Sequence, residues 1–250
     1  MDSTYRLVSI PASHYCEKAR WALDRLDVPY REEGHPPVLH WRAARSAGGG
    51  RTVPILVTDL GVMPDSTEIL QFLDARHAGD WRPYPLDEAQ KTEVEELEEL
   101  FDSRLGPHTR RVVYFYLLQY KHHFLQSILA GVGKGERTVF KLSLPVMKFL
   151  LRKGMKITPS SAERSMEKVR EVFATVDDRL ADGRKFLVGD TFSAADLTFA
   201  ALAAPVLLPR EYGSVLPPLT ELPDDLLAVV EEFRSAPAGQ FGLRIYRDFR

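Results

Sequence analysis

The sequence is poor in cysteine: Cys16 is the single one among 250 residues, so no disulfide can form within the chain. Such usage is typical of proteins in a reducing compartment. An excess of either charge is also missing, because 33 Lys and Arg residues face 35 Asp and Glu residues, for a formal net charge of −2. Since duplex binding depends on a basic face that neutralises phosphates, we expect no nucleic-acid partner.

Long hydrophobic runs are absent as well, and no apolar stretch is long enough to span a bilayer. The start of the chain, MDSTYRLVSIPASHYC, lacks a basic segment followed by an apolar run, so we expect no secretory signal and a cytoplasmic location. The composition is that of a globular protein, 44% hydrophobic and 27% charged. The length permits one large domain or two smaller ones.

The first third of the chain carries the pattern of a compact α/β unit. Residues 4–10 form a β-rich run that ends at Pro11, and residues 52–59 form a second run with a proline near its start. Residues 65–77 show helical spacing, and so does the segment that follows Pro11, with apolar positions at Cys16, Ala19, Leu23 and Leu26. Strand, helix, hairpin and helix within about 80 residues predict an α/β domain over residues 1–80.

The second part of the chain is predicted to be helical. A linker is marked by Trp81, Pro83 and Pro85, and after it the β-type alternation disappears. We predict helices over residues 87–104, 107–130, 137–153, 160–182, 193–204 and 224–235. The sequence therefore predicts an all-helical domain over residues 86–250.

A thiol site is predicted where the first strand gives way to the first helix. The helix dipole and the free backbone N–H groups of such a turn stabilise a thiolate, and the hydroxyl of Ser13 can add a hydrogen bond that favours the ionised sulfur. On the facing strand, a cis Val53-Pro54 bond can leave the backbone of Val53 free for an extended peptide. Asp65 and Ser66 open the next helix, where amides and a hydroxyl can hold a carboxylate and Asp65 can attract an amino group.

These segments resemble the three glutathione-contacting motifs of the glutathione transferase family, at SHYC (13–16), TVPI (52–55) and DSTEI (65–69). Residues 186–202, FLVGDTFSAADLTFAAL, resemble the signature of that family's helical domain and contain a capping box. The resemblance implies an α/β thioredoxin-like N-terminal domain followed by an all-α helical-bundle domain, and a homodimer. Residues 105–158 match no pattern of this kind.

The resemblance also implies roles for single residues. Ser13 falls where serine-type transferases place the hydroxyl that hydrogen-bonds the glutathione sulfur. Val53 would pair with the cysteinyl backbone, while Asp65, in place of the family's frequent Glu, would hold the γ-glutamyl end with Ser66. The glycine carboxylate usually meets a basic or amide side chain ahead of the cis-proline, a position for which the sequence offers His40, Arg42 and Arg51.

Several of these residues have simpler interpretations. Ser13 could be only a helix N-cap. Cys16 could be the nucleophile of a thiol reductase, but its spacing places it on the inward face of the helix, so we favour packing. Tyr116 and Tyr120 could line a pocket for an apolar electrophile, with core packing as the alternative. His122 and its neighbour lack further ligands at metal-binding spacing, so we expect no metal.

Residues 134–156 combine many apolar side chains with seven basic residues against Glu136 alone. Such a stretch can lie on an anionic membrane surface, but a solvated basic face over a buried apolar stripe is the commoner arrangement, and we favour it. Taken together, the residues predict an enzyme that lowers the thiol pKa of glutathione and directs the thiolate at a small apolar electrophile. A non-catalytic scaffold of the same fold and a Cys16-dependent reductase are the alternatives.

Overall fold

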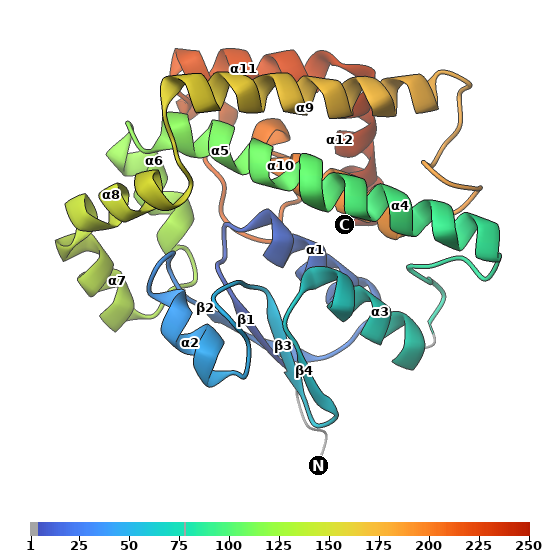
Figure 1. Cartoon of the computed structure of the whole chain (residues 1–250), viewed down its shortest axis with the longest axis horizontal. Coiled ribbons are helices and arrows are strands. Elements are labelled where there is room, and N and C mark those ends of the chain that lie inside the picture. Colours follow the sequence, from blue (N-terminus) through green and yellow to red (C-terminus); the bar gives the residue numbers. More distant parts are fainter. Residues whose placement is uncertain (1–4, 78) are drawn as a thin grey trace.

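The computed structural model describes residues 5–77 and 79–250, and it has a sheet domain beneath a larger group of helices (Figure 1). The sheet has the strand order β2-β1-β3-β4. β1 pairs with β2 in parallel and with β3 antiparallel, and β3 pairs antiparallel with β4. The strands are β1 (Tyr5–Ser9), β2 (Tyr30–Gly34), β3 (Ile55–Thr58) and β4 (Gly61–Met63).

Both faces of the sheet are covered, because successive side chains of a strand point to opposite sides. Leu7 and Leu56 belong to the large core that contains the apolar residues of α1 (His14–Arg25) and α3 (Ser66–Arg76). Val8 and Ile55, one position along each strand, pack instead against Ala44 and Ala47 at α2 (His40–Ser46). The predicted α/β unit is confirmed by this mixed four-stranded sheet and its helices.

The rest of the chain is helical, as predicted. Its helices are α4 (Glu88–Arg104), α5 (Gly106–Leu117), α6 (Lys121–Leu129), α7 (Lys134–Leu142), α8 (Leu144–Gly154), α9 (Pro159–Leu180), α10 (Ala194–Leu207), the 3-10 turn η1 (Leu219–Glu221), α11 (Asp224–Ser235) and α12 (Pro237–Phe249). No helix in the described ranges combines the length and the apolarity that crossing a bilayer requires.

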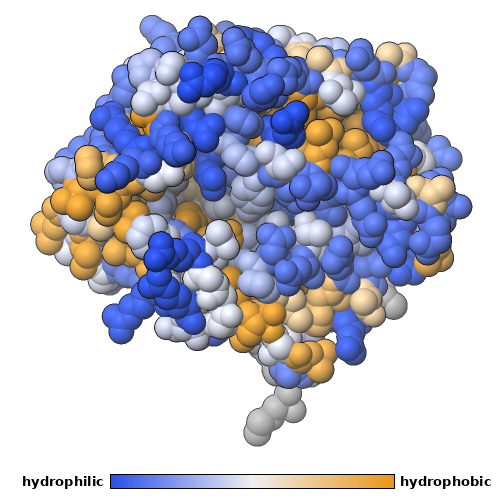
Figure 2. Space-filling model, viewed as in Figure 1, coloured by the Kyte–Doolittle hydropathy of each residue, from blue (hydrophilic) through white to orange (hydrophobic). Residues whose placement is uncertain are grey.

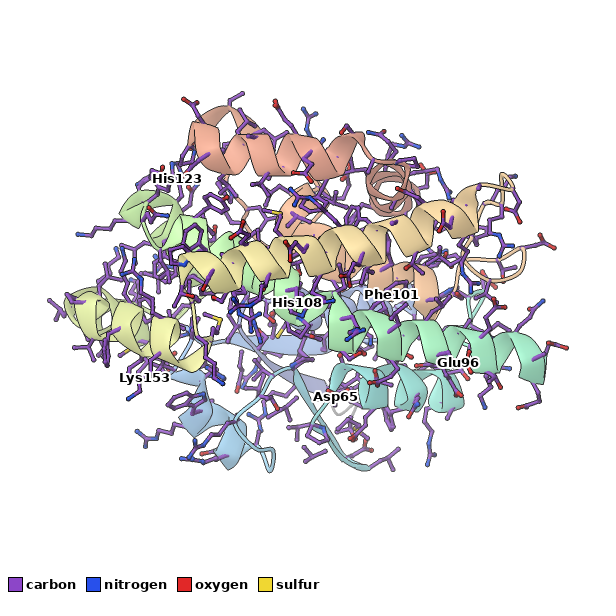
Figure 3. The ribbon with its side chains drawn as sticks, turned by 45° about the horizontal axis from the view of Figure 1, so that its top comes forward. Asp65, Glu96, Phe101, His108, His123 and Lys153 are labelled. Atoms are coloured by element: carbon purple, nitrogen blue, oxygen red, sulfur yellow. The ribbon has the colours of Figure 1, made fainter. Side chains whose placement is uncertain are left out.

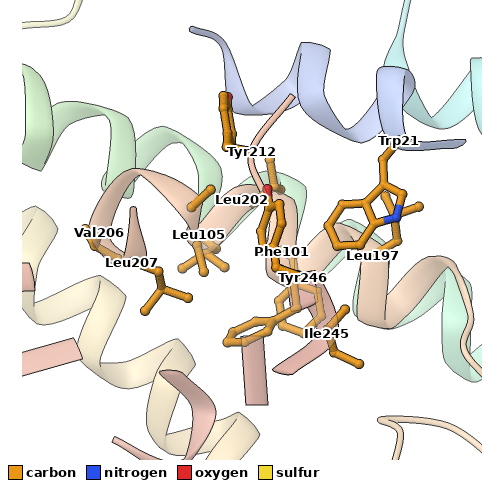
Figure 4. Packing of buried hydrophobic residues seen from close by; sticks show 14 of the residues in the cluster. Trp21, Phe101, Leu105, Leu197, Leu202, Val206, Leu207, Tyr212, Ile245 and Tyr246 are labelled. Carbon is orange, nitrogen blue, oxygen red and sulfur yellow. The ribbon is translucent and has the colours of Figure 1, made fainter. Parts of the chain in front are cut away.

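The core of this domain surrounds α10, in which every residue from 194 to 204 is buried (Figure 4). At the N-terminus of α10, the carboxylate of Asp196 accepts hydrogen bonds from the amides of Leu187 and Ser193 at 2.7 and 2.9 Å. Burial raises the pKa of Asp196 to about 6. Asp196 is therefore structural, as its capping position predicts.

Two predicted helices are divided in the structure, and two helices, α2 and α12, were not predicted. The expected helix over residues 107–130 ends at Leu117 and resumes at Lys121. The expected helix over 137–153 is interrupted at Ser143, whose hydroxyl donates to the carbonyl of Val139, and Pro145 occupies the first turn of the helix that follows. The helix α12 lies outside the predicted set and packs its buried Phe241, Ile245 and Tyr246 against the core.

A cluster of buried charges on α1 joins the sheet domain to α4. Lys18 is fully buried, and its Nζ lies 2.7 Å from Glu98 Oε1 and 2.8 Å from Asp102 Oδ2. Tyr84 donates to the other oxygen of Glu98 at 2.7 Å, and Lys18 also donates to the hydroxyl of Thr67 at 3.0 Å. Burial opposes the charge of Lys18, but the two carboxylates outweigh it and raise its pKa.

A second cluster fixes α1 to the C-terminal helix. The buried carboxylate of Glu17 pairs with Arg20 and with Arg250, whose Nε lies 2.8 Å away, and it accepts from the amide of Gly213 at 3.0 Å. The indole of Trp21 donates to the carbonyl of Phe249 at 3.0 Å. The helix that follows the predicted thiol site is thus held from two sides by paired, buried groups.

Candidate functional site

A cavity of about 440 Å³ lies between the sheet domain and the helices α5, α6, α8 and α10. Its size falls in the range of small-molecule sites. The sheet domain contributes the turn before α1 with Ser13, the start of α2 with His40 and Trp41, and residues 51–53. Four of the predicted site residues therefore line one cavity, namely Ser13, His40, Arg51 and Val53.

Ser13 is half-buried and stands at the N-cap of α1, with its carbonyl accepting from the amide of Glu17 at 2.9 Å. Its own amide donates to the carbonyl of Ile10 at 2.8 Å, which fixes the turn. The hydroxyl makes no capping hydrogen bond to the helix. It lies close enough to the Cys16 thiol to affect its pKa, and it lines the cavity beside the amides that the first turn of any helix leaves unpaired.

His14 and Arg110 line the same cavity as Ser13. The imidazole Nε2 of His14 donates to the carbonyl of Gly106 at 2.9 Å, and burial together with the charge of Arg110 lowers its pKa to about 3. His14 is thus neutral and ties the site to α5. Arg110 has no acidic partner among the described residues, and its buried Nε has no hydrogen bond there either.

Cys16 is fully buried and does not line the cavity. Its sulfur accepts from the amide of Ile10 at 3.4 Å. Burial raises the pKa of the thiol to about 11, against weaker opposing effects of Arg20, the Ile10 amide and the Ser13 hydroxyl. Cys16 is therefore protonated near neutral pH, in agreement with its interpretation as a packing residue.

The facing wall is formed by the segment before β3. The Val53-Pro54 peptide bond is cis, which confirms the prediction, and the backbone of Val53 makes no hydrogen bond within the described part of the chain. His40 donates from Nε2 to the carbonyl of Arg51 at 3.0 Å, and burial lowers its pKa. The guanidinium of Arg51 lies 5.7 Å from the ring centre of Trp41 at the cavity rim, whereas the exposed Arg42 lies outside the cavity.

Asp65 and Ser66 do not line this cavity. Asp65 is exposed and caps α3, accepting from the amide of Thr67 at 2.8 Å, and Figure 3 labels it at the start of that helix. Ser66 is buried, and its hydroxyl has no hydrogen-bond partner among the described residues. The third predicted contact region thus has a buried hydroxyl without a partner in the described part of the chain, but its residues are not among those that line the cavity with Ser13.

The helical wall of the cavity differs from the predicted one, because Tyr116 and Tyr120 do not line it. Tyr120 instead donates to Asp225 at 3.2 Å. The face of α5 that lines the cavity carries Arg110, Val113, Tyr114 and Leu117, at i, i+3, i+4 and i+7. Tyr116 lies off this face, and Tyr120 lies beyond the break after Leu117.

Sequence reasoning missed this face of α5, although two signals pointed to it. The four residues have the spacing of a single helical stripe. In addition, Arg110 has Gly106 and Tyr114 at four-residue spacing, and Pro107 and Val113 at three, so it has no acidic neighbour on its own helix. Among the described residues, no three His, Cys, Asp or Glu side chains are grouped as a metal site would require.

Comparisons with known proteins agree with this geometry. The N-terminal domain model of glutathione S-transferase matches residues 7–81, and the C-terminal domain model matches residues 159–231, so that together they span more than half of the chain. No curated protein matches the sequence.

Solved structures match over nearly the whole chain. A glutathione S-transferase from Methylobacterium radiotolerans, in complex with glutathione sulfonate, has 18% identity and a TM-score of 0.55, covering 96% of this chain and 94% of its own. One from Methylobacillus flagellatus with GSH bound has 17% identity and a TM-score of 0.55, covering 96% and 98%. The β-etherase LigF from a Sphingobium strain has 15% identity and a TM-score of 0.60, covering 96% and 99%. At such identities these structures share the fold, and with the two matched domains they show that the chain belongs to the glutathione S-transferase family.

Proposed function

We propose that the protein is a glutathione transferase in which Ser13 activates the glutathione thiol for attack on a small apolar electrophile. Ser13 lines a cavity at the N-terminus of α1 with a hydroxyl that does not cap the helix, and this is the observation that carries the proposal. In the proposed division of labour, residues 1–80 bind glutathione and residues 86–250 supply the wall for the electrophile. We expect the active form to be a cytoplasmic homodimer, as is implied by the family resemblance.

Three groups would stabilise the thiolate in this arrangement. The Ser13 hydroxyl would donate a hydrogen bond to the sulfur, and the first amides of α1 would add the positive end of the helix dipole. Arg110 lines the same cavity without an acidic partner in the described part of the chain, so its charge would also favour the ionised sulfur. The thiolate would then attack the electrophile directly, with no covalent intermediate on the protein.

The remaining parts of the tripeptide have candidate partners. The free backbone of Val53 would pair with the cysteinyl unit. Arg51 suits the glycine carboxylate better than His40, because His40 is neutral and its Nε2 already bonds the Arg51 carbonyl. The buried hydroxyl of Ser66 and the exposed carboxylate of Asp65 would hold the γ-glutamyl end. On the other side, Val113, Tyr114, Leu117 and Phe124 would receive an apolar electrophile.

A Cys16-dependent reductase is not favoured, because an attacking cysteine needs a lowered pKa and access to solvent. Cys16 has a raised pKa and is fully buried. A non-catalytic scaffold of the same fold needs no glutathione at all, so binding of glutathione separates it from the transferase.

The test combines calorimetric titration of the full chain with glutathione and measurement of the bound thiol pKa by thiolate absorbance. Ser13→Ala should raise the bound thiol pKa by about 1–2 units, since a hydrogen bond to a charged group contributes about 1.5–3 kcal/mol. Cys16→Ala, the control, should leave that pKa unchanged. Absence of binding at millimolar glutathione would favour the scaffold, and an unchanged pKa in Ser13→Ala would exclude the role given to Ser13.

A further inference from the structure

The surface formed by α7 and α8 (residues 134–156, here the α7–α8 surface) exposes apolar side chains that a solvated helix pair would bury. Half of the ten large hydrophobic side chains exposed in the described part of the chain lie on it: Val139, Leu142, Val146, Phe149 and Leu150. Leu142 is 81% exposed and Phe149 is 63% exposed. In Figure 2 this region is the group of hydrophobic residues at the left, over α7 and α8.

The exposed residues form a second apolar face, distinct from the one that packs on the core. On α8, Val146, Phe149 and Leu150 share one side of the helix, and buried Met147 and Leu151 occupy another. The expected arrangement of a basic face over one buried stripe is therefore wrong for this segment, because the stripe on the solvent side is apolar as well. Contiguous exposed apolar surface of this kind marks an interaction site.

Cations without acidic partners surround this apolar face. Six basic side chains are exposed, and none forms a salt bridge within residues 5–77 and 79–250: Lys134, Arg137, Lys141, Arg152, Lys153 and Lys156. The acidic Glu136 is paired with His35 at 2.9 Å. Lys153 continues the stripe of Val146 and Phe149 by one helical turn, and Figure 3 labels it on α8 at the outer edge of the molecule.

A groove between α6 and α7 extends the same charge pattern. Its lining combines the apolar Leu125 and Leu129 with Lys121, Arg137 and Lys141, and it contains no acidic side chain. A groove with both apolar and cationic lining residues matches a phospholipid, whose headgroup is anionic and whose acyl chains are apolar.

We propose that the α7–α8 surface docks the protein on an anionic lipid bilayer, with Leu142, Val146 and Phe149 in the interfacial region and the surrounding lysines and arginines against the headgroups. An amphipathic helix that lies in the bilayer plane has this distribution of side chains. Nucleic acid would leave the apolar face uncovered. A second copy of the chain would bring like charges together, which is unfavourable at an interface.

The inference is independent of the proposed transferase activity, because none of its residues binds glutathione in that proposal. The proposed membrane surface does, however, adjoin the cavity. Leu150 lines the cavity and is 36% exposed on the α7–α8 surface, so the two features meet at α8.

Flotation of the full chain with vesicles tests the proposal. Vesicles of phosphatidylcholine mixed with phosphatidylglycerol should carry the protein, vesicles of phosphatidylcholine alone should carry far less, and salt near 1 M should weaken binding as the Debye length falls to about 3 Å. Leu142→Gln combined with Phe149→Gln should lower the partition coefficient at least about tenfold. Lys153→Glu should lower it by about tenfold through loss of headgroup attraction.

Matched changes elsewhere separate this surface from general properties of the chain. Leu86 is 78% exposed, like Leu142, and Lys185 is an exposed lysine away from α7 and α8, so Leu86→Gln and Lys185→Glu should bind like wild type. Circular dichroism would verify that each variant is folded. The proposal fails if wild type does not float with anionic vesicles, or if the surface variants bind as well as the controls. Self-association that is lost in the Leu142 and Phe149 variant, without lipid binding, would also overturn it.

Discussion

The Lys18 cluster on α1 and the α7–α8 surface differ in how their positive charges are buried and paired. Lys18 is fully buried and meets two carboxylates and a hydroxyl, and Tyr84 satisfies a further oxygen of the same cluster. The six exposed cations of the α7–α8 surface have no acidic partner in the described residues. Because a buried charge is tolerated only when it is paired, the Lys18 cluster holds α1 against α4. The α7–α8 surface leaves charge available for another molecule.

Breaking the buried cluster should have the largest effect on stability. Lys18→Met leaves Glu98 and Asp102 without their cation in a buried site, and we expect a loss of about 3–5 kcal/mol in the free energy of unfolding. Denaturant unfolding measures the loss. The matched control is Lys168→Met, which removes a partly exposed pair with Glu171 and should cost about 0–1 kcal/mol. Equal losses in the two variants would contradict the role of the Lys18 cluster.

Two phenylalanines, one on α7 and one on α8, test the difference between the buried and the exposed side of this helix pair. Phe140 is fully buried, whereas Phe149 is mostly exposed. We expect Phe140→Ala to lower the free energy of unfolding by about 3–5 kcal/mol, because it leaves a cavity in the core. Phe149→Ala should change it by no more than about 0.5 kcal/mol. Comparable losses from both would mean that Phe149 is buried in solution, and the docking face would then be covered by the protein itself.

Arg110 gives a third case for this comparison, since it lines a cavity and has no acidic partner among the described residues. We expect Arg110→Met to change the free energy of unfolding by less than about 1 kcal/mol, because no buried carboxylate loses its partner. The same variant should raise the bound thiol pKa of glutathione by about 1 unit. Arg164→Met on the exposed face of α9 is the control and should affect neither quantity. A large loss of stability would indicate that Arg110 has a structural role, like Lys18, instead of a role at the thiol.

In the sheet domain the sequence alone predicted β1, α1, the β3–β4 hairpin and α3, because their signals are local, but it did not predict β2 or α2. Period-two and helical patterns are short-range, and the segments around Ser13, Val53-Pro54 and Asp65 each lie on a single turn or strand start. The structure has the predicted cis bond and brings Ser13, Arg51 and Val53 to one cavity. What local patterns could not supply was the distance between segments, and Asp65 with Ser66 proved to lie outside that cavity.

The helical domain was predicted less completely, for a reason that Tyr120 illustrates. A continuous helix over 107–130 would place Tyr116 and Tyr120 on one stripe, but the chain leaves the helix after Leu117 and the phase is lost. Nothing between Leu117 and Lys121 is a proline or glycine, so no breaker indicated the interruption. The cavity wall made by Arg110 and Tyr114 follows from how α5 packs against the other helices, which a periodic pattern cannot specify.

The double role of α8 has a thermodynamic consequence. Its inner side, with Leu151, lines the cavity, while its outer side, with Phe149, belongs to the surface proposed to meet lipid. Binding free energies at two sites on one protein are reciprocal. If a ligand in the cavity changes the affinity for the bilayer by some factor, the bilayer must change the affinity for that ligand by the same factor. The eleven-residue helix α8 would then couple the two binding equilibria, so that the affinity for glutathione depends on the membrane and the affinity for the membrane depends on glutathione.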